Sequence, residues 1–348
     1  MANIMVTDVC NLHCPYCFAN EFVNKSKNEI SLEAFQKAVD FIVRDNAHKT
    51  VGIIGGEPTV HSQFELLMQT LIKDTRVERV MLYTNGVLLD RFWDVCCHAK
   101  VAMLINCNAP SFIGDKAYQR TVENLDTLFN QKLCRERVTL GINLYQPDFQ
   151  YDYMIELLER YDLHKVRVSV TVPNMDDQRN INAHAYFLSM KPQLLAFFHA
   201  LLSRDIIPHF DCNKIPSCLL TEEELRGFDR YLQSDYIKAH IGDSNIADTR
   251  VVCSPVVDIR QDLTAVRCFG LSDSTKQPIE AFHDLTELEK FYTGTVDAFA
   301  YNTVYAKACT DCHLRKVLKC TGGCLAFKIN AINALQQAAQ RKMEAVND

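Results

Sequence analysis

Short apolar runs rich in β-branched residues alternate with longer amphipathic stretches up to about residue 215. The strand-like runs are Ile4–Val9, Thr50–Ile54, Arg79–Tyr83, Val101–Asn106, Val138–Leu144, Lys165–Val172 and Ile207–Phe210. The helical stretches include Ser31–Arg44, Gln63–Ile72, Leu88–His98, Asp115–Asn130, Tyr153–Tyr161 and Tyr186–Ser203. This alternation predicts an α/β fold built from βαβ units around a parallel sheet. Six or seven units without a clear eighth predict a partial (β/α)6-type TIM barrel.

The pattern changes from about residue 236. Val256–Arg260 and Ala265–Cys268 flank a turn at Gln261-Asp262 and predict a β-hairpin region. A loop-rich, cysteine-bearing stretch follows, and a helical pattern runs from Leu325 to about Glu344. We therefore predict two domains, a barrel over residues 1–235 and a small cysteine-rich domain over residues 236–348 with a hairpin and a C-terminal helix.

Composition and charge narrow the class of protein. The net charge of −6 provides no basic surface for a nucleic-acid partner. No apolar run approaches the length of a membrane span, and the N-terminus lacks the features of a signal peptide. Fifteen cysteines without a secretion signal favour metal or cluster ligation in a reducing cytoplasm over disulfides. Four of them fall in apolar settings that predict small buried side chains: Cys96, Cys97, Cys107 and Cys134.

Cys10, Cys14 and Cys17 follow the first predicted strand in a Cys-x3-Cys-x2-Cys spacing. Three thiolates are too few for a closed tetrahedral zinc site, but they suit a cubane iron–sulfur cluster with one open iron. A zinc knuckle or an inert cysteine group is the alternative. Gly55-Gly56-Glu57-Pro58 follows the second strand, where glycines let the backbone approach a ligand and Glu57 suits a ligand ammonium group. The ends of parallel strands meet on one face, so we expect these groups to share a site.

These two motifs resemble the signature of the radical S-adenosylmethionine (SAM) superfamily. The resemblance implies that Cys10, Cys14 and Cys17 hold a [4Fe–4S] cluster whose fourth iron is chelated by SAM, and that Gly55, Gly56 and Glu57 bind the amino group of SAM. It further implies that Tyr16 touches the adenine and that Asn106 and Arg120 hold the ribose and carboxylate, with Asn143 as a second ribose candidate. Alternatively, Tyr16 is a packing aromatic and Arg120 a solvated helix residue.

The later cysteines resemble the SPASM/twitch extension of radical SAM enzymes, which implies one or two auxiliary [4Fe–4S] clusters. The ligand candidates are Cys253, Cys268, Cys309, Cys312, Cys320 and Cys324, in a Cys-x14-Cys, gap, Cys-x2-Cys-x7-Cys-x3-Cys pattern. The full SPASM pattern has a seventh cysteine, whereas none follows Cys324, and the x7 spacing is slightly long. Two clusters with three thiolates each, one complete cluster with spare thiols, and a zinc ribbon all stay open. Cys212 and Cys218 are candidates for a missing ligand or a catalytic hydrogen-atom donor, or are plain loop cysteines.

The implied reaction is reductive cleavage of SAM to a 5′-deoxyadenosyl radical, which removes a hydrogen atom from a substrate C–H bond. By resemblance the substrate is a ribosomally made peptide that is cross-linked, epimerised or oxidised. The alternatives are a twitch-type dehydrogenase of a small molecule and a non-catalytic zinc-binding protein. Phe269 stands where sulfatase-maturating relatives have an aspartate base, which argues against formylglycine formation. A reductant such as flavodoxin or ferredoxin is implied. Because Cys10 comes so early, a leader-peptide-binding module is expected to be a separate protein.

Overall fold

The structure is a computed structural model of the chain. It describes residues 1–17, 19, 22–131, 134–171, 183–210, 217–241, 253, 255–268, 271, 275–304, 306–330, 332 and 336. The chain divides into two compact units, one of residues 1–142 and 255–296 and the other of residues 143–254 and 297–348.

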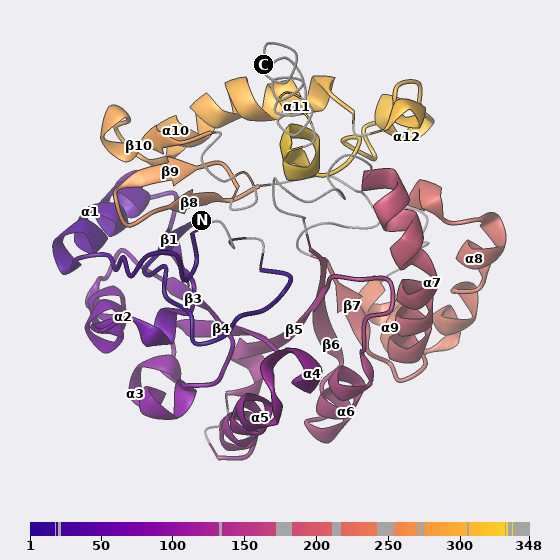
Figure 1. Cartoon of the computed structure of the whole chain (residues 1–348), viewed down its shortest axis with the longest axis horizontal. Coiled ribbons are helices and arrows are strands. Elements are labelled where there is room, and N and C mark those ends of the chain that lie inside the picture. The colour runs from indigo at the N-terminus through magenta and orange to yellow at the C-terminus, as the bar shows by residue number, and fades with distance from the viewer. Residues whose placement is uncertain are drawn as a thin grey trace, which may run out of the picture. The chain divides into compact units, whose positions relative to one another are not determined.

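The first unit contains a mainly parallel sheet covered by helices. Its strands are β1 (Ala2–Met5), β2 (Thr50–Ile54), β3 (Arg79–Thr84), β4 (Val101–Asn106), β5 (Val138–Leu144, of which 143–144 fall in the second unit), β8 (Val257–Ile259), β9 (Thr264–Val266) and β10 (Gln277–Pro278). Its helices are α1 (Leu32–Val43), α2 (Phe64–Lys73), α3 (Trp93–Cys96), α4 (Pro110–Ile113), α5 (Asp115–Asn130) and α10 (Leu285–Tyr292). Shorter helical turns are η1 (Pro58–Val60), η2 (Leu89–Arg91), η3 (Arg135–Arg137), η9 (Ile279–Ala281) and η10 (Thr293–Asp297), the last reaching the unit boundary. Figure 1 shows α1, α2, α3 and α5 outside these strands.

The strand order in the first unit is β10-β9-β8-β1-β2-β3-β4-β5. β1 pairs in parallel with β2 on one edge and with β8 on the other, so Ala2 lies between Val51 and Val257. β8 and β9 pair antiparallel, which confirms the predicted hairpin. The α/β class with a parallel-sheet core and a cysteine-rich later region is likewise confirmed. The predicted division at residue 235 stays a prediction, although the hairpin region lies in the first unit because β8 extends its sheet.

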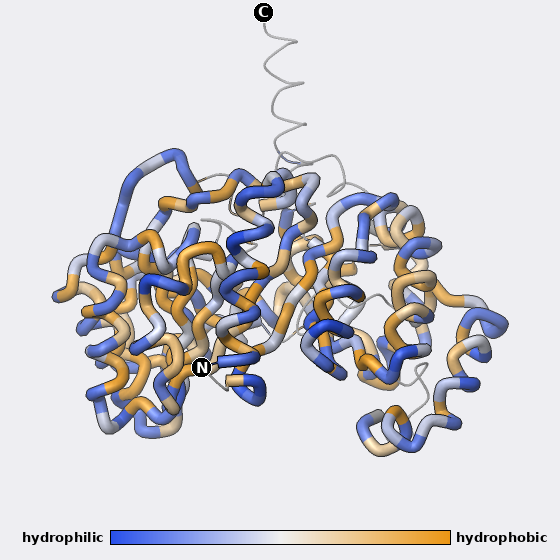
Figure 2. Tube along the Cα trace, turned by 90° about the horizontal axis from the view of Figure 1, so that it is seen from below, coloured by the Kyte–Doolittle hydropathy of each residue, from blue (hydrophilic) through white to orange (hydrophobic). Residues whose placement is uncertain are grey.

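Local sequence accounts for α1 and for the buried strands. The Ser31 hydroxyl accepts a hydrogen bond from the Ala34 N–H and caps α1, at the residue where the predicted helical stretch begins. One face of α1 carries its buried hydrophobic residues and the other face is exposed. Hydrophobic (orange) and hydrophilic (blue) residues accordingly alternate along the helices in Figure 2. Residues 101–105 of β4 are all buried, as expected for a parallel strand covered on both faces.

Two predicted elements have different bounds in the structure. β1 ends at Met5 rather than Val9, because Thr7 and Val9 lead into the cysteine loop and accept backbone hydrogen bonds from the residues after β2. The helix predicted over Leu88–His98 is wrong as one element: it is split into η2 and α3 at Phe92, whose φ of −138° is not helical. The Phe92 ring packs edge-on against Phe64 of α2, with centroids 4.9 Å apart, so a tertiary contact accompanies the break.

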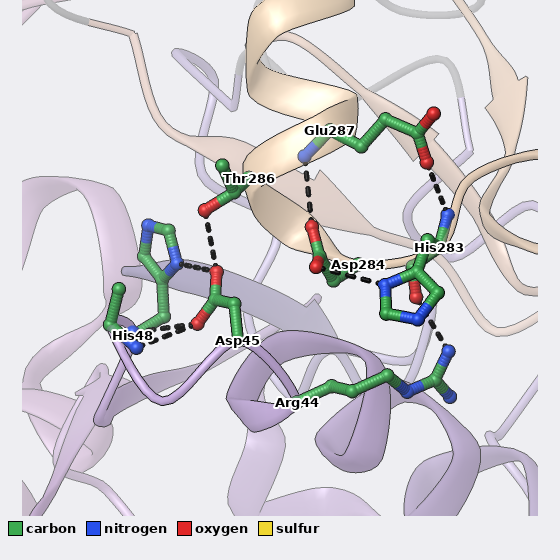
Figure 3. A network of polar contacts seen from close by, with 8 residues as sticks. Arg44, Asp45, His48, His283, Asp284, Thr286 and Glu287 are labelled. Carbon is green, nitrogen blue, oxygen red and sulfur yellow. Dashed lines mark hydrogen bonds and ion pairs between the residues drawn. The ribbon is translucent and has the colours of Figure 1, made fainter.

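A polar network joins α10 to the segment that follows α1 (Figure 3). The Asp45 carboxylate, 8% exposed, accepts hydrogen bonds from the Thr286 hydroxyl at 2.6 Å and from His48 Nδ1 at 2.6 Å. Arg44 donates to the His283 carbonyl at 2.5 Å, and Asp284 caps α10 by accepting from the Glu287 N–H. Although burial alone would raise the pKa of Asp45, the hydrogen bonds from Thr286, His48 and the Ala47 N–H lower it.

Asp45→Asn is expected to destabilise the first unit by about 2 kcal/mol at pH 7, because one acceptor oxygen becomes a donor facing Thr286 and His48. The folded-state pKa is depressed, so this stabilisation is present above the unfolded pKa of about 3.9 and is lost as the pH falls through the folded value. Denaturant unfolding at several pH values measures it. The control is Asp40→Asn, since Asp40 pairs with Arg76 at an exposed site. Equal losses in both variants would contradict the account.

The second unit is built from helices around two parallel strands. Its elements are α6 (Asp152–Arg160), β6 (Lys165–Val170), α7 (Ala183–Leu202), β7 (Ile207–His209), η5 (Ser217–Leu219), α8 (Glu222–Arg226), η6 (Asp229–Gln233), α9 (Asp235–Ile241), α11 (Ala298–Asn302), η11 (Lys307–Cys309) and α12 (His313–Lys316). Residues 325–330 are helical, and most of the predicted helix beyond them lies outside the described residues. Thr221 and Glu224 form a capping box that starts α8. Leu202, Phe228 and Ile237 form a buried cluster in this unit. No helix in the described part of the chain is long and apolar enough to cross a membrane.

Candidate active site

The loop that carries Cys10, Cys14 and Cys17 begins a few residues after the end of β1, and all three cysteines are partly buried. The Leu12 N–H donates to Cys10 Sγ at 3.4 Å. Burial raises the pKa of the Cys10 thiol to about 12 and that of Cys14 to about 11, and it also raises the pKa of Cys17. Cys14 and Cys17 both act electrostatically on Cys10, so the three thiols share one neighbourhood. Thiolate ligation there must release protons.

Asn24 holds this loop from the other side. Its Oδ1 accepts from the Cys10 N–H at 2.8 Å, and its Nδ2 donates to the Leu12 carbonyl at 3.3 Å. Asn24 has a φ of 60°, a left-handed conformation that asparagine tolerates better than most residues. The sequence analysis missed Asn24, because its only local signal is an asparagine in a turn.

Asn24→Ala is expected to weaken cluster retention, since it removes both bonds to the loop, each with a net value of about 1 kcal/mol. The measurement is the rate of iron loss to a chelator after anaerobic reconstitution, which should rise several-fold. Asn46→Ala is the matched control because Asn46 also has a left-handed φ, of 56°, at the end of α1. Equal rates in the two variants would show that only backbone strain matters.

Asp8 is a second buried anchor that the sequence analysis missed. Its carboxylate accepts from the Ser26 hydroxyl at 2.7 Å, from Asn28 Nδ2 at 3.1 Å and from Gln261 Nε2 at 2.8 Å. Gln261 lies in the turn of the β8–β9 hairpin, so the hairpin contacts the chain that leads into the cysteine loop.

Gly55 and Gly56 pack against the same stretch of chain. The Gly56 N–H donates to the Thr7 carbonyl at 2.7 Å, and the Glu57 N–H donates to the Val9 carbonyl at 2.9 Å. A Cβ on Gly55 would lie 2.6 Å from the Thr7 oxygen, and one on Gly56 would lie 2.4 Å from the Val9 oxygen. Both distances are prohibitive, so only glycine allows the chain after β2 to approach the residues before Cys10.

Glu57 is 1% exposed and ties the ends of β2 and β3 together. Its Oε1 accepts from the Thr59 hydroxyl at 2.6 Å, the Thr84 hydroxyl at 2.7 Å and the Thr59 N–H at 3.2 Å, and its Oε2 accepts from the Asn85 N–H at 2.7 Å. Burial raises the pKa of Glu57 in spite of these donors. The carboxylate is thus engaged by the chain itself, and its contact with a ligand ammonium group stays a prediction. Asn85 Nδ2 also donates to Asn11 Oδ1 in the cysteine loop, so three strand ends meet there.

The structure places the remaining predicted SAM contacts in different surroundings. Asn106 ends β4 with a buried Oδ1 that has no hydrogen-bond partner among the described residues. Tyr16 is buried, hydrogen-bonds Cys14 and packs edge-on against Phe112, with centroids 6.0 Å apart. Arg120 forms a partly exposed ion pair with Asp90 at 2.5 Å, and Asn143 Oδ1, in the second unit, accepts from Arg167 at 2.7 Å. The ligand roles of these residues stay predictions.

The cysteines of the second unit lie in two neighbourhoods. A hydrogen bond with Cys324 lowers the pKa of Cys253 to about 7, against the opposing effect of burial. Beside this pair, the buried Lys328 Nζ donates to the Ala300 and Thr321 carbonyls at 2.6 Å each, and burial lowers its pKa to about 8. Burial raises the pKa of Cys309, and the charges of Cys320 and Cys312 raise it further. Cys268 lies in the first unit and is partly buried, whereas Cys212 and Phe269 lie outside the described residues.

The predicted apolar cysteines are mostly as expected. Cys96, Cys107 and Cys134 are buried, while Cys97 is partly exposed. Burial raises the pKa of Cys107 to about 12, which keeps that thiol protonated and unreactive.

The comparisons with known proteins agree with the geometry of the cysteine loop. Residues 4–159 match the family model of the radical SAM superfamily. These residues therefore form a radical SAM domain, the domain that radical SAM enzymes share. The family implies a [4Fe–4S] cluster and SAM.

Proteins with similar sequences are named as two different enzymes. The chain is 25% identical over 226 residues to "GTP 3′,8-cyclase" of Mannheimia succiniciproducens, covering 64% of this chain and 60% of that protein. It is 37% identical over 87 residues to the enzyme of the same name from Desulforamulus reducens, covering 24% and 26%. It is also 37% identical over 90 residues to "7,8-dihydro-6-hydroxymethylpterin dimethyltransferase" of Methanocaldococcus jannaschii, covering 26% and 18%. The chain thus spans at most 60% of the length of these three relatives.

Solved structures share the fold over most of the chain. "Native anSMEcpe with bound AdoMet and Cp18Cys peptide" has a TM-score of 0.63 at 16% identity and covers 99% of this chain and 97% of that one. Streptococcus suis SuiB bound to precursor peptide SuiA has a TM-score of 0.60 at 13% identity and covers 93% and 71%. At these identities the likeness concerns the fold alone.

The residues of the cysteine loop fit the cluster and SAM that the family implies. Three mutually interacting thiols share the loop, and Asn106 offers a buried acceptor at the end of β4. Among the described residues no three His, Cys, Asp or Glu side chains are already gathered in metal-binding geometry.

Proposed function

We propose that the chain reductively cleaves SAM at a cluster held by Cys10, Cys14 and Cys17 and abstracts hydrogen from a C–H bond of a ribosomally made peptide. The observation that carries the SAM chemistry is the cysteine loop hydrogen-bonded to Gly56 and Glu57 through Thr7 and Val9. When bound, the cluster and SAM supply one-electron reduction, methionine, and a 5′-deoxyadenosyl radical that takes a hydrogen atom from the substrate. The electron comes from an external reductant of the flavodoxin or ferredoxin class.

The chain's own residues hold and orient these groups in this proposal. Asn24 and Asp8 fix the cysteine loop, while Glu57 locks the ends of β2 and β3 beside it. Gly55 and Gly56 keep the backbone close enough for their peptide groups to serve the SAM ammonium group, and Asn106 Oδ1 is a buried acceptor suited to a ribose hydroxyl. Tyr16 lies beside Cys14, where its ring can border the adenine.

The fold likeness to two proteins whose structures contain a peptide supports the peptide substrate. The test is anaerobic incubation of the reconstituted protein, SAM and dithionite with short peptides encoded beside the gene. We expect one peptide to increase 5′-deoxyadenosine formation and to lose two hydrogens by mass, or to take up solvent deuterium if it is epimerised. Modification of none of them would contradict the peptide proposal.

A small-molecule substrate is the second candidate, because the similar curated proteins include GTP 3′,8-cyclases. The same assay with GTP in place of the peptide distinguishes the two. Consumption of GTP coupled to 5′-deoxyadenosine formation would favour this candidate.

A further inference from the structure

The turn of the β8–β9 hairpin contacts the chain just before Cys10. Gln261 in this turn donates through Nε2 to Asp8 Oδ1 at 2.8 Å, and the two residues are 253 positions apart in the sequence. Both lie in the first unit, but Gln261 lies outside residues 4–159, which match the radical SAM family model. The cysteine loop is thus contacted by a side chain that neither its motif nor the matched segment contains.

The buried Asp8 carboxylate has one oxygen for the loop and one for the hairpin. Asp8 is 2% exposed. The Ser26 hydroxyl and Asn28 Nδ2 both donate to Asp8 Oδ2, at 2.7 and 3.1 Å. Among the described residues, Gln261 is the donor that reaches Oδ1. A buried acceptor that loses its donor is destabilised, so the loop's own residues cannot replace Gln261.

Hydrogen bonds connect the position of Asp8 with that of Cys10. The Asn24 N–H donates to the Asp8 carbonyl at 2.8 Å, and Asn24 Oδ1 accepts from the Cys10 N–H at 2.8 Å. The Asp8 N–H donates to the Asn28 carbonyl at 3.0 Å. A displacement of Asp8 therefore also displaces Asn24, and with it the bond that holds the Cys10 peptide.

The hairpin turn is fixed independently of the cysteine loop. The Arg260 N–H donates to the Thr264 carbonyl at 2.7 Å, and the Leu263 N–H donates to the Arg260 carbonyl at 3.0 Å. Asp262 accepts from the Thr264 N–H at 3.1 Å and pairs with Lys276 at 2.9 Å. Because β8 also pairs with β1, which precedes the cysteine loop, the turn has a defined place beside that loop.

We propose that Gln261 is a positioning residue for the [4Fe–4S] cluster of the cysteine loop, acting through Asp8 on the peptide that carries Cys10. A second contact joins the same two segments, because the Arg260 guanidinium lies over the Phe22 ring, 4.9 Å from its centroid. The hairpin preforms the loop in the iron-free chain and slows the release of iron from the loaded one. This role rests on the cluster proposed for the loop, so the first test uses the iron-free chain.

The first test is amide hydrogen exchange of the full iron-free chain, measured by mass spectrometry on peptides that cover residues 8–17. Gln261→Ala is expected to speed exchange there by about tenfold, the effect of one hydrogen bond to a charged group. Gln69→Ala is the matched control, since Gln69 also donates to a carboxylate, that of Glu65 at 3.2 Å, but at an exposed site on α2. Equal exchange in the two variants would overturn the proposal, whatever metal the chain binds.

The second test exchanges donor and acceptor in the reconstituted protein. Gln261→Glu places a second carboxylate against Asp8 and is expected to speed iron loss to a chelator by about tenfold or more. Adding Asp8→Asn gives the new carboxylate an amide donor, so the rate is expected to return to within about threefold of the wild-type rate. A role of residue 261 in filling space alone would give no such recovery.

The rate of iron loss is followed by the decay of the EPR signal that SAM perturbs in dithionite-reduced samples, which reports the cluster of the cysteine loop. Circular dichroism of the iron-free variants checks that they fold. A folded double variant that loses iron as fast as Gln261→Glu would overturn the proposal. A wild-type chain that forms no cluster would contradict the proposed function instead, and the exchange measurement would still decide whether Gln261 orders the loop.

Discussion

Replacing Gly56 with alanine is expected to lower SAM cleavage by about 100-fold or more. The new Cβ would lie 2.4 Å from the Val9 carbonyl oxygen and 2.6 Å from the Val9 carbonyl carbon, and neither backbone atom can rotate away as a side chain can. The strand edge must separate from the chain that leads into Cys10, and a displacement of about 1 Å in a catalytic constellation costs on the order of 100-fold in rate.

Gly294→Ala is the matched control for this variant. A Cβ on Gly294 meets no atom within 4 Å, so the same chemical change is made without a clash. The measurement is 5′-deoxyadenosine formed per reconstituted chain, with iron content and circular dichroism recorded for both variants. A Gly56→Ala protein that cleaves SAM as fast as Gly294→Ala would refute the close approach described for β2.

Replacing Glu57 with alanine is expected to destabilise the protein by about 3 kcal/mol or more and to abolish SAM cleavage. Four donors, from Thr59, Thr84 and Asn85, would lose their buried acceptor at once. An unsatisfied buried donor costs about 1–3 kcal/mol, and here the donors also set the relative position of the ends of β2 and β3.

Denaturant unfolding of the iron-free protein measures the loss of stability separately from cluster binding. Glu65→Ala is the control, since Glu65 lies in the exposed first turn of α2 and its carboxylate accepts a hydrogen bond from the Gln69 side chain at the surface. The effect of this variant should stay within about 0.5 kcal/mol. If Glu57→Ala matched this control in stability while losing SAM cleavage, Glu57 would act on the ligand and not on the fold.

The sequence predicts the features of this protein that depend on local pattern. The alternation of strands and helices gives β2, β3, β4 and β5 nearly to the residue, and Ser31 and Thr221 are recognisable caps. The Cys-x3-Cys-x2-Cys and Gly-Gly-Glu-Pro motifs point to the same strand ends that the structure joins. Such features are predictable because each depends on a few neighbouring residues.

Features that depend on distant contacts were not predicted. Asn24 holds the cysteine loop only because a left-handed turn returns it to Cys10. Pairing of β8 with β1 joins residues that are far apart in the sequence. Phe92, which breaks a predicted helix, has no local signal for its role.

The central claim is that Cys10, Cys14 and Cys17 hold the cluster that cleaves SAM. The most direct measurement is 5′-deoxyadenosine formation by the anaerobically reconstituted protein with SAM and dithionite, beside the Cys10/Cys14/Cys17→Ala variant. The account predicts cleavage by the wild-type protein, none by the variant, and an iron content lower in the variant by about four per chain. A well-folded wild-type protein that takes up zinc, forms no iron–sulfur cluster and never cleaves SAM would contradict it.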